Sequence, residues 1–99
     1  MDIPQLVKIE ILKSDPKAEV VLFGSRARGD NKADSDWDFL VLLDGAPDNN
    51  QKESILEHLY DLELKTDSVI SAIIYSKAEW EDRSITPLYQ VIMEEGKRA

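Results

Sequence analysis

Residues 19–43 read EVVLFGSRARGDNKADSDWDFLVLL, and this stretch decides the fold. Its two ends, residues 19–23 and 36–43, are short apolar runs that predict buried strands. The segment from Gly24 to Ser35 is rich in glycine, aspartate, asparagine and arginine and poor in apolar side chains, which predicts a polar loop. We therefore expect two strands that bracket a charged loop.

The rest of the chain carries helical and strand patterns around this stretch. Asp2 and Pro4 form a helix start, and apolar residues then recur with helical spacing. The other predicted elements are helices over residues 3–14, 51–65, 76–80 and 86–96 and a third strand over residues 68–75. This order predicts an α+β fold, a mixed α/β sheet of about three to four strands packed against helices, in a single domain over residues 1–99.

Composition places the chain among soluble globular proteins. Apolar residues make up 42% and charged residues 32% of the 99 residues, which is the size of one small domain. No segment approaches the ~20 apolar residues that cross a bilayer, and residues 1–13 lack the pattern of a secretory signal. We therefore expect a cytoplasmic protein without a membrane segment. The chain is also too short for a second substrate domain, so another molecule should help to hold any acceptor.

Charge and cysteine content limit the possible ligands. The formal net charge of −8 argues against broad binding to a nucleic-acid backbone. It favours a basic protein partner, unless the charge serves only to keep the protein soluble. With no cysteine and one histidine, the chain offers no disulfide, zinc-thiolate site or histidine cluster. Any bound metal must therefore have oxygen ligands.

Gly24 and Ser25 begin the charged loop and could hold a phosphate. Glycine lets the backbone leave the strand sharply and approach a ligand closely, while Ser25 offers a hydroxyl and the following amides could open a short helix. Arg26 and Arg28 could add positive charge around a triphosphate. The alternative is that this segment is only a solvated basic turn.

Asp36 and Asp38 lie two residues apart on a predicted strand and therefore project from the same face. A rise of about 3.3 Å per residue separates their Cβ atoms by roughly 6.5 to 7 Å. Carboxylates so disposed can hold two metal ions about 3.5 to 4 Å apart, and magnesium prefers such ligands together with water and substrate phosphates. Both acids could instead decorate an exposed strand start, but the apolar run after them makes unused charges there costly.

The pattern Gly-Ser-x-Ala-Arg-Gly from residue 24, followed by Ser-Asp-x-Asp from residue 35 and an apolar run, resembles a known family signature. It is similar to the polymerase-beta-type nucleotidyltransferase superfamily, in its minimal nucleotidyltransferase branch. The resemblance implies that Gly24, Ser25, Ser35 and the two loop arginines bind ATP or another nucleoside triphosphate. It also implies that Asp36 and Asp38 are catalytic residues that hold Mg²⁺, with two ions expected.

The resemblance further implies a third acid on a later strand. Asp67, at the start of the predicted strand 68–75, is the best candidate for this catalytic and metal-binding residue, although its neighbours depart from the usual apolar-Asp-apolar pattern. Asp67 could equally be a turn residue, and Glu63 is a weaker substitute. In the implied mechanism the acids hold magnesium against the triphosphate while an acceptor hydroxyl attacks the α-phosphorus and pyrophosphate leaves.

Two functions from different classes stay open at this point. The first is an enzyme that transfers a nucleoside monophosphate, with AMP from ATP as the expected case, to a hydroxyl acceptor. The resemblance implies a HEPN-type toxin as protein partner, with one of its tyrosines as the acceptor. The second is a binding module or antitoxin that keeps the fold and neutralises a partner by association alone. A homodimer is also compatible with apolar helix faces.

Several other residues are expected to have no role in binding or catalysis. Trp37, between the two acids, should face the opposite side of its strand and pack in the core. His58, on a predicted helix without companion ligands, should lie at the surface or boundary. Glu94 and Glu95 are expected to be solvated residues at a helix end.

Overall fold

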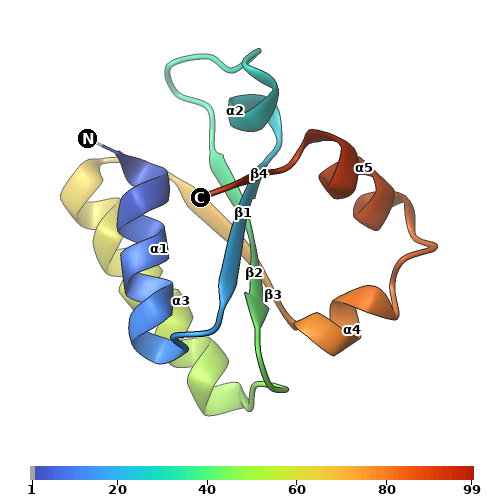
Figure 1. The fold of residues 1–99 in the computed structure, drawn as a ribbon. Helices are drawn as coiled ribbons and strands as arrows, with labels where there is room; N and C mark the ends of the chain where they lie inside the picture. The colour runs from blue at the N-terminus through green and yellow to red at the C-terminus, as the bar shows by residue number, and fades with distance from the viewer. Residues whose placement is uncertain (1) are drawn as a thin grey trace.

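The structure is a computed structural model, and it describes residues 2–99. Its centre is a four-stranded mixed sheet in the order β3-β2-β1-β4 (Figure 1). β1 runs antiparallel to β2 and β4, whereas β2 and β3 are parallel. The strands are β1 (Glu19–Phe23), β2 (Trp37–Leu43), β3 (Ile70–Ser76) and β4 (Lys97–Arg98). The predicted mixed sheet is confirmed, and the short strand β4 is an addition that the sequence pattern did not predict.

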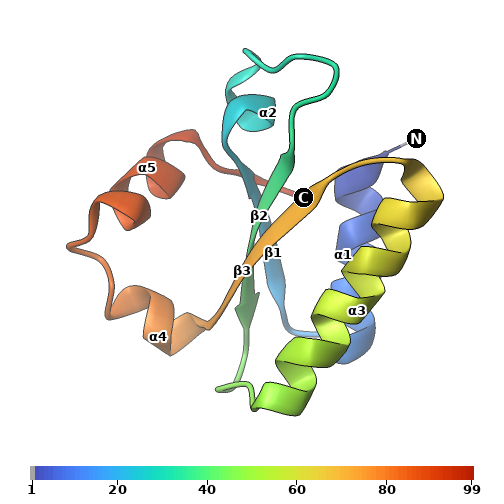
Figure 2. The same ribbon diagram turned by 180° about the vertical axis from the view of Figure 1, so that it is seen from behind.

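Helices lie on both faces of the sheet (Figures 1 and 2). They are α1 (Ile3–Ser14), α2 (Ser25–Arg28), α3 (Asn49–Thr66), α4 (Lys77–Glu81) and α5 (Pro87–Glu95). α1 and α3 pack side by side on one face, while α4 and α5 lie on the other. α2 is a single turn at the end of the sheet, between β1 and β2. Within residues 2–99, no helix has the length and apolar character needed to span a membrane.

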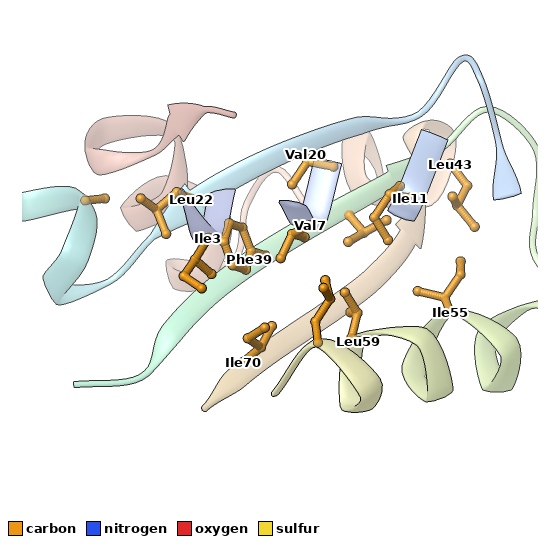
Figure 3. Close-up of a cluster of buried hydrophobic side chains, with 13 residues drawn as sticks. Ile3, Val7, Ile11, Val20, Leu22, Phe39, Leu43, Ile55, Leu59 and Ile70 are labelled. Carbon is orange, nitrogen blue, oxygen red and sulfur yellow. The ribbon is translucent and has the colours of Figure 1, made fainter. Parts of the chain in front are cut away.

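The larger core lies between the sheet and the layer formed by α1 and α3 (Figure 3). Phe39 and the alternate residues of β2 after it are completely buried in this core, because alternate strand residues face the same side. Leu40 and Leu42 point the other way, into a smaller cluster with Trp80 and Ile92. β2 is therefore packed on both faces, which fixes the direction of every side chain along it.

Polar side chains fix where the helices begin. Asp2 and Thr86 cap α1 and α5, each accepting a hydrogen bond from a backbone amide in the first turn. Ser76 and Glu79 form a capping box at the start of α4, where the sequence predicts a helix over residues 76–80, and both reciprocal hydrogen bonds are present. These three helix starts were expected from the sequence and are confirmed.

The boundary between α3 and β3 differs from the prediction. α3 continues to Thr66, and β3 begins at Ile70 rather than at residue 68. Asp67 ends α3 in the left-handed conformation, with φ 52° and ψ 43°, and its amide donates to the carbonyl of Glu63. The prediction that Asp67 lies at the start of a strand is therefore wrong, because a left-handed residue turns the chain before the strand can begin.

Candidate active site

Gly24 ends β1 with a backbone conformation that suits only glycine. Its φ is 78° and its ψ is −162°, a region that a side chain makes strongly unfavourable. There is also no room for a side chain, because a Cβ atom at Gly24 would collide with Oδ2 of Asp38. The backbone of the loop therefore begins directly against the Asp38 carboxylate.

The helical turn α2 follows Gly24 and is fixed at both ends. Ala27 is buried against the larger core. Gly29 closes the turn in the left-handed conformation, with φ 83°, and its amide donates to the carbonyl of Ser25 over 2.9 Å. Ser25 is consequently held at the first position of the turn, next to Gly24.

Arg26 holds the loop together from within. Its Nη2 donates to the carbonyls of Ser35 at 2.9 Å and Ala33 at 3.1 Å. The guanidinium also lies over the ring of Trp37, 4.2 Å from the centroid. The Ser35 hydroxyl accepts the amide of Lys32 at 2.8 Å. Arg26 and Ser35, both predicted to bind the nucleotide, therefore make their contacts inside the loop and set its shape.

Arg28 points toward the end of α5 and pairs with Glu95. Its Nη1 lies 3.0 Å from Oε2 and 3.3 Å from Oε1 of Glu95, and its Nε lies 3.1 Å from Oδ2 of Asp30. Oε1 of Glu95 also accepts the Gly24 amide at 3.0 Å. The prediction that Glu95 is solvated is wrong, because only 15% of its side chain is exposed. Sequence reasoning missed Glu95 because its partners lie 67 and 71 residues earlier in the chain.

Asp38 is half-buried and lies on the face of β2 opposite Trp37, which packs against the larger core as predicted. Burial raises the pKa of the Asp38 carboxyl above its usual value, and the negative charge of Asp36 raises it further. Arg28 lowers this pKa and Glu95 raises it. Asp36 is exposed and precedes β2 by one residue, so its charge lies near Asp38 at the mouth of the strand. A cation placed here would relieve the repulsion.

The structure does not bring a third acid to this pair. In the parallel register of β2 and β3, Ser71 lies opposite Asp38 and therefore on the same face of the sheet. Asp67 is exposed in the turn before β3, which matches the alternative that the sequence left open. Glu63 uses its Oε2 to accept the amide of Ile70 at 3.2 Å. Across the described chain, no three acidic or histidine side chains are grouped so that they could hold a metal ion.

The chain has the architecture of a small nucleotidyltransferase, a mixed sheet whose end carries a glycine turn packed against paired aspartates. Comparison with known sequences places it in a defined family. The sequence model of the nucleotidyltransferase domain matches residues 7–98, so the chain belongs to the nucleotidyltransferase domain family. The predicted family and enzyme class are both confirmed, and the chain is a nucleotidyltransferase.

Individual relatives agree with this assignment. A protein of Methanocaldococcus jannaschii with the provisional name protein adenylyltransferase is 38% identical over 82 residues, which cover 78% of this chain and 83% of the relative. A crystal structure of a toxin–antitoxin with AMP-PNP has a TM-score of 0.68 at 23% identity, covering 97% of this chain and 71% of that one. A variant of the toxin–antitoxin MntA–HpeT has a TM-score of 0.59 at 26% identity, covering 93% and 68%. The structural neighbours confirm the predicted fold.

Proposed function

We propose that this chain transfers AMP from ATP to a hydroxyl group of a protein, with Asp36 and Asp38 as the metal-binding acids. The observation that carries this proposal is the close approach of Gly24 to Asp38, which sets the Gly24-Ser25 turn beside the carboxylates. A triphosphate bound by the turn would lie within reach of a cation held by the acids. The name of the Methanocaldococcus relative supports a protein acceptor, and the AMP-PNP of a solved neighbour supports an adenine nucleotide.

Magnesium suits the donors that the chain presents. One or two carboxylates completed by phosphate oxygens and water are the ligand set that Mg²⁺ prefers, so Asp36 and Asp38 would hold it together with the nucleotide. Bound there, magnesium would polarise the α-phosphate and neutralise the charge of the departing pyrophosphate. Burial is the main cause that raises the pKa of Asp38 and the charge of Asp36 adds to it, so a cation shared by the two carboxylates would stabilise their charged forms.

The side chains supply position and charge rather than a covalent nucleophile. The Gly24-Ser25 turn would orient the terminal phosphates, and Arg28 would balance their negative charge. The acceptor oxygen then bonds to the α-phosphorus as the bond to the pyrophosphate oxygen breaks, and the hydroxyl proton passes to solvent. Arg26 contributes by keeping the loop in shape through its bonds to Ser35 and Ala33.

The acceptor in this proposal is a tyrosine of a HEPN-type toxin. Two solved neighbours are toxin–antitoxin structures, which supports a protein partner of this kind. The net charge of −8 favours a partner with a basic surface.

A second candidate function is a binding module that neutralises its partner without catalysis. The observation that favours it is Ser71, because this position beside Asp38 carries a hydroxyl where a third carboxylate would complete the acid group. A site with two acids could still bind nucleotide while transferring it slowly. Activity and partner binding must therefore be measured separately.

The test uses ATP labelled at either the α- or the γ-phosphate, with magnesium and the co-purified partner. The native chain should label the partner from α-labelled ATP and not from γ-labelled ATP, which separates nucleotidyl from phosphoryl transfer. Asp36→Asn plus Asp38→Asn should abolish labelling while partner binding persists. Asp34→Asn plus Glu94→Gln removes the same charge from exposed positions and should leave labelling intact. Equal partner binding with no labelling by any chain would establish the binding module instead.

A further inference from the structure

Glu95 joins the last turn of α5 to the loop that begins at Gly24. Its Oε1 accepts the Gly24 amide at 3.0 Å, and both of its oxygens accept from Nη1 of Arg28, at 3.0 and 3.3 Å. The Glu95 side chain is 15% exposed, whereas 46% of the Arg28 side chain is exposed. The Glu95 carboxylate therefore accepts hydrogen bonds from both a backbone amide and a guanidinium of the loop.

Local helix energetics do not explain this placement. A negative charge on the last residue of a helix is opposed by the helix dipole, which favours cations at that end. Glu95 also lies close enough to Asp38 for its charge to raise the pKa of the Asp38 carboxyl. The contacts to Arg28 and Gly24 outweigh both effects, and they lower the pKa of Glu95 itself, with Arg28 as the larger cause. The carboxylate is held there by the loop.

The two donors that hold Glu95 are those that a phosphate would use. A backbone amide free of side-chain cover and a guanidinium with two oxygens in reach form a recognition unit for a phosphate as well as for a carboxylate. We propose that Glu95 occupies the place of a nucleotide phosphate in the free protein, so that an incoming triphosphate binds by displacing it. This inference rests on the proposed function, because it takes the Gly24 loop as the triphosphate site.

A competing internal carboxylate lowers the apparent affinity for nucleotide. When a ligand binds only the open form, its apparent dissociation constant equals the intrinsic dissociation constant divided by the fraction of molecules that are open. If Glu95 is seated about nine-tenths of the time, removing it should tighten triphosphate binding about tenfold. Adenosine carries no phosphate, so its binding should not depend on Glu95.

An opposite role for Glu95 would give the opposite sign. If Glu95 instead served as the third acid beside Asp36 and Asp38, removing its charge would weaken the binding of a metal–triphosphate complex. The same substitution therefore separates displacement from coordination by the direction of the change alone.

The experiment is a calorimetric titration of the 99-residue chain with AMP-PNP and magnesium, and in parallel with adenosine. The chains compared are the native protein, Glu95→Gln, Glu95→Ala and the matched control Glu94→Gln. Glu94 is exposed and adjacent, and its substitution removes the same charge. A cooperative thermal melting transition would verify that each variant is folded. The amide resonance of Gly24, recorded without ligand, should shift in both Glu95 variants and stay in place in Glu94→Gln.

AMP-PNP should bind about tenfold more tightly to Glu95→Gln than to the native chain, and at least as tightly to Glu95→Ala as to Glu95→Gln. Glu94→Gln should bind AMP-PNP with the native affinity. Adenosine should bind all four chains with the same affinity. AMP-PNP binding that is no tighter in either Glu95 variant than in the native chain would overturn the displacement, while the proposed function would stand. If no chain binds AMP-PNP although the Gly24 resonance reports the Glu95 contact, the proposed function itself fails and the displacement fails with it.

Discussion

Gly24 and Asp38 are in such close contact that the space a Cβ atom would need at Gly24 is filled by Oδ2 of Asp38. At this end of the antiparallel pair, β1 is followed by the Gly24 backbone, which carries no side chain, and β2 presents the Asp38 carboxylate. The contact explains why a glycine is required at this position for two separate reasons, its positive φ and the absence of space.

Gly24→Ala should remove nucleotidyl transfer and destabilise the chain. The new methyl group would push Asp38 aside, and a non-glycine residue in this backbone region costs about 1–3 kcal/mol. Urea denaturation would measure the loss in the free energy of unfolding. Gly45→Ala is the control, because nothing lies within 4 Å of a Cβ at that glycine. Similar stability for the two variants would show that the Gly24 conformation is not constrained as described.

Asp38→Asn should lower the transfer rate by about a hundredfold or more while raising stability slightly. A positioned charge in an active site commonly accounts for about 10²–10³ in rate. Burial and the charge of Asp36 raise the pKa of Asp38, so its charged form is disfavoured in the folded state and the neutral amide should slightly raise the free energy of unfolding at pH 7. A variant that loses stability together with activity would indicate a structural role instead.

Arg26→Lys should lower the free energy of unfolding by about 1–2 kcal/mol, because lysine cannot reproduce two carbonyl hydrogen bonds and the stacking on Trp37. Arg28→Lys should change stability by much less, since 46% of the Arg28 side chain is exposed and ion pairs in contact with solvent contribute little. Thermal and urea unfolding of the two variants would test this difference. Equal losses of stability in the two variants would show that Arg26 does not hold the loop more firmly than Arg28 does.

Asp67→Gly should stabilise the chain by about 0.5–1 kcal/mol, because Asp67 adopts the left-handed conformation that glycine adopts without strain. Transfer should be unchanged, since Asp67 is exposed in the turn before β3 and no three acidic or histidine side chains of the described residues are grouped to hold a metal ion. The paired measurement is the urea midpoint and the rate of partner labelling. A large loss of labelling would restore Asp67 as the third catalytic acid.

Asp15→Asn should reduce the loss of stability in acid. Oδ2 of Asp15 accepts the Asp44 amide at 2.8 Å and Oδ1 accepts the Lys17 amide at 3.0 Å. The Asp44 hydrogen bond is the main cause that lowers the pKa of Asp15 below 3.8. Its stabilisation is therefore complete above pH about 3.8 and disappears as the pH falls through the lowered value.

At pH 7 the Asp15→Asn variant should be about 0.5–1 kcal/mol less stable than the native chain, because an amide oxygen is a weaker acceptor than a carboxylate. The difference should be smaller at pH 2 than at pH 7. Urea midpoints at both pH values measure this. Asp61→Asn, on the exposed face of α3, serves as the comparison. A difference that persists unchanged at pH 2 would show that the Asp15 carboxylate does not hold the amides in its charged form.

Local chemistry made much of the fold predictable. β2 carries an uninterrupted apolar run after Asp38, and such a run has few alternatives to a strand packed on both faces. Ser76 with Glu79 marked a helix start, because the two side chains satisfy amides within four residues of each other. Both features are decided by neighbours in sequence, so they could be read without the structure.

Other parts depended on contacts that the sequence does not display. Asp67 stands before a β-branched run, and only the left-handed backbone shows that it belongs to the turn. Glu95 resembles Glu94 in sequence, yet only Glu95 reaches Gly24 and Arg28. Arg26 and Arg28 likewise look alike, and the path of the loop sends them in different directions. Tertiary contacts alone distinguish Glu94 from Glu95 and Arg26 from Arg28. The backbone conformation alone decides that Asp67 belongs to the turn and not to the strand.

The position of the site on a hairpin also bears on the order in which it is assembled. β1 and β2 pair across 15 to 23 residues, from Phe23 with Asp38 to Glu19 with Leu42, whereas β1 meets β4 across 75 to 77 residues. Because short loops close at lower entropic cost, we expect the Gly24 turn and its acids to meet early in folding. Glu95 lies 71 residues after Gly24 in the chain, so during synthesis the Gly24 loop should form before Glu95 can reach it.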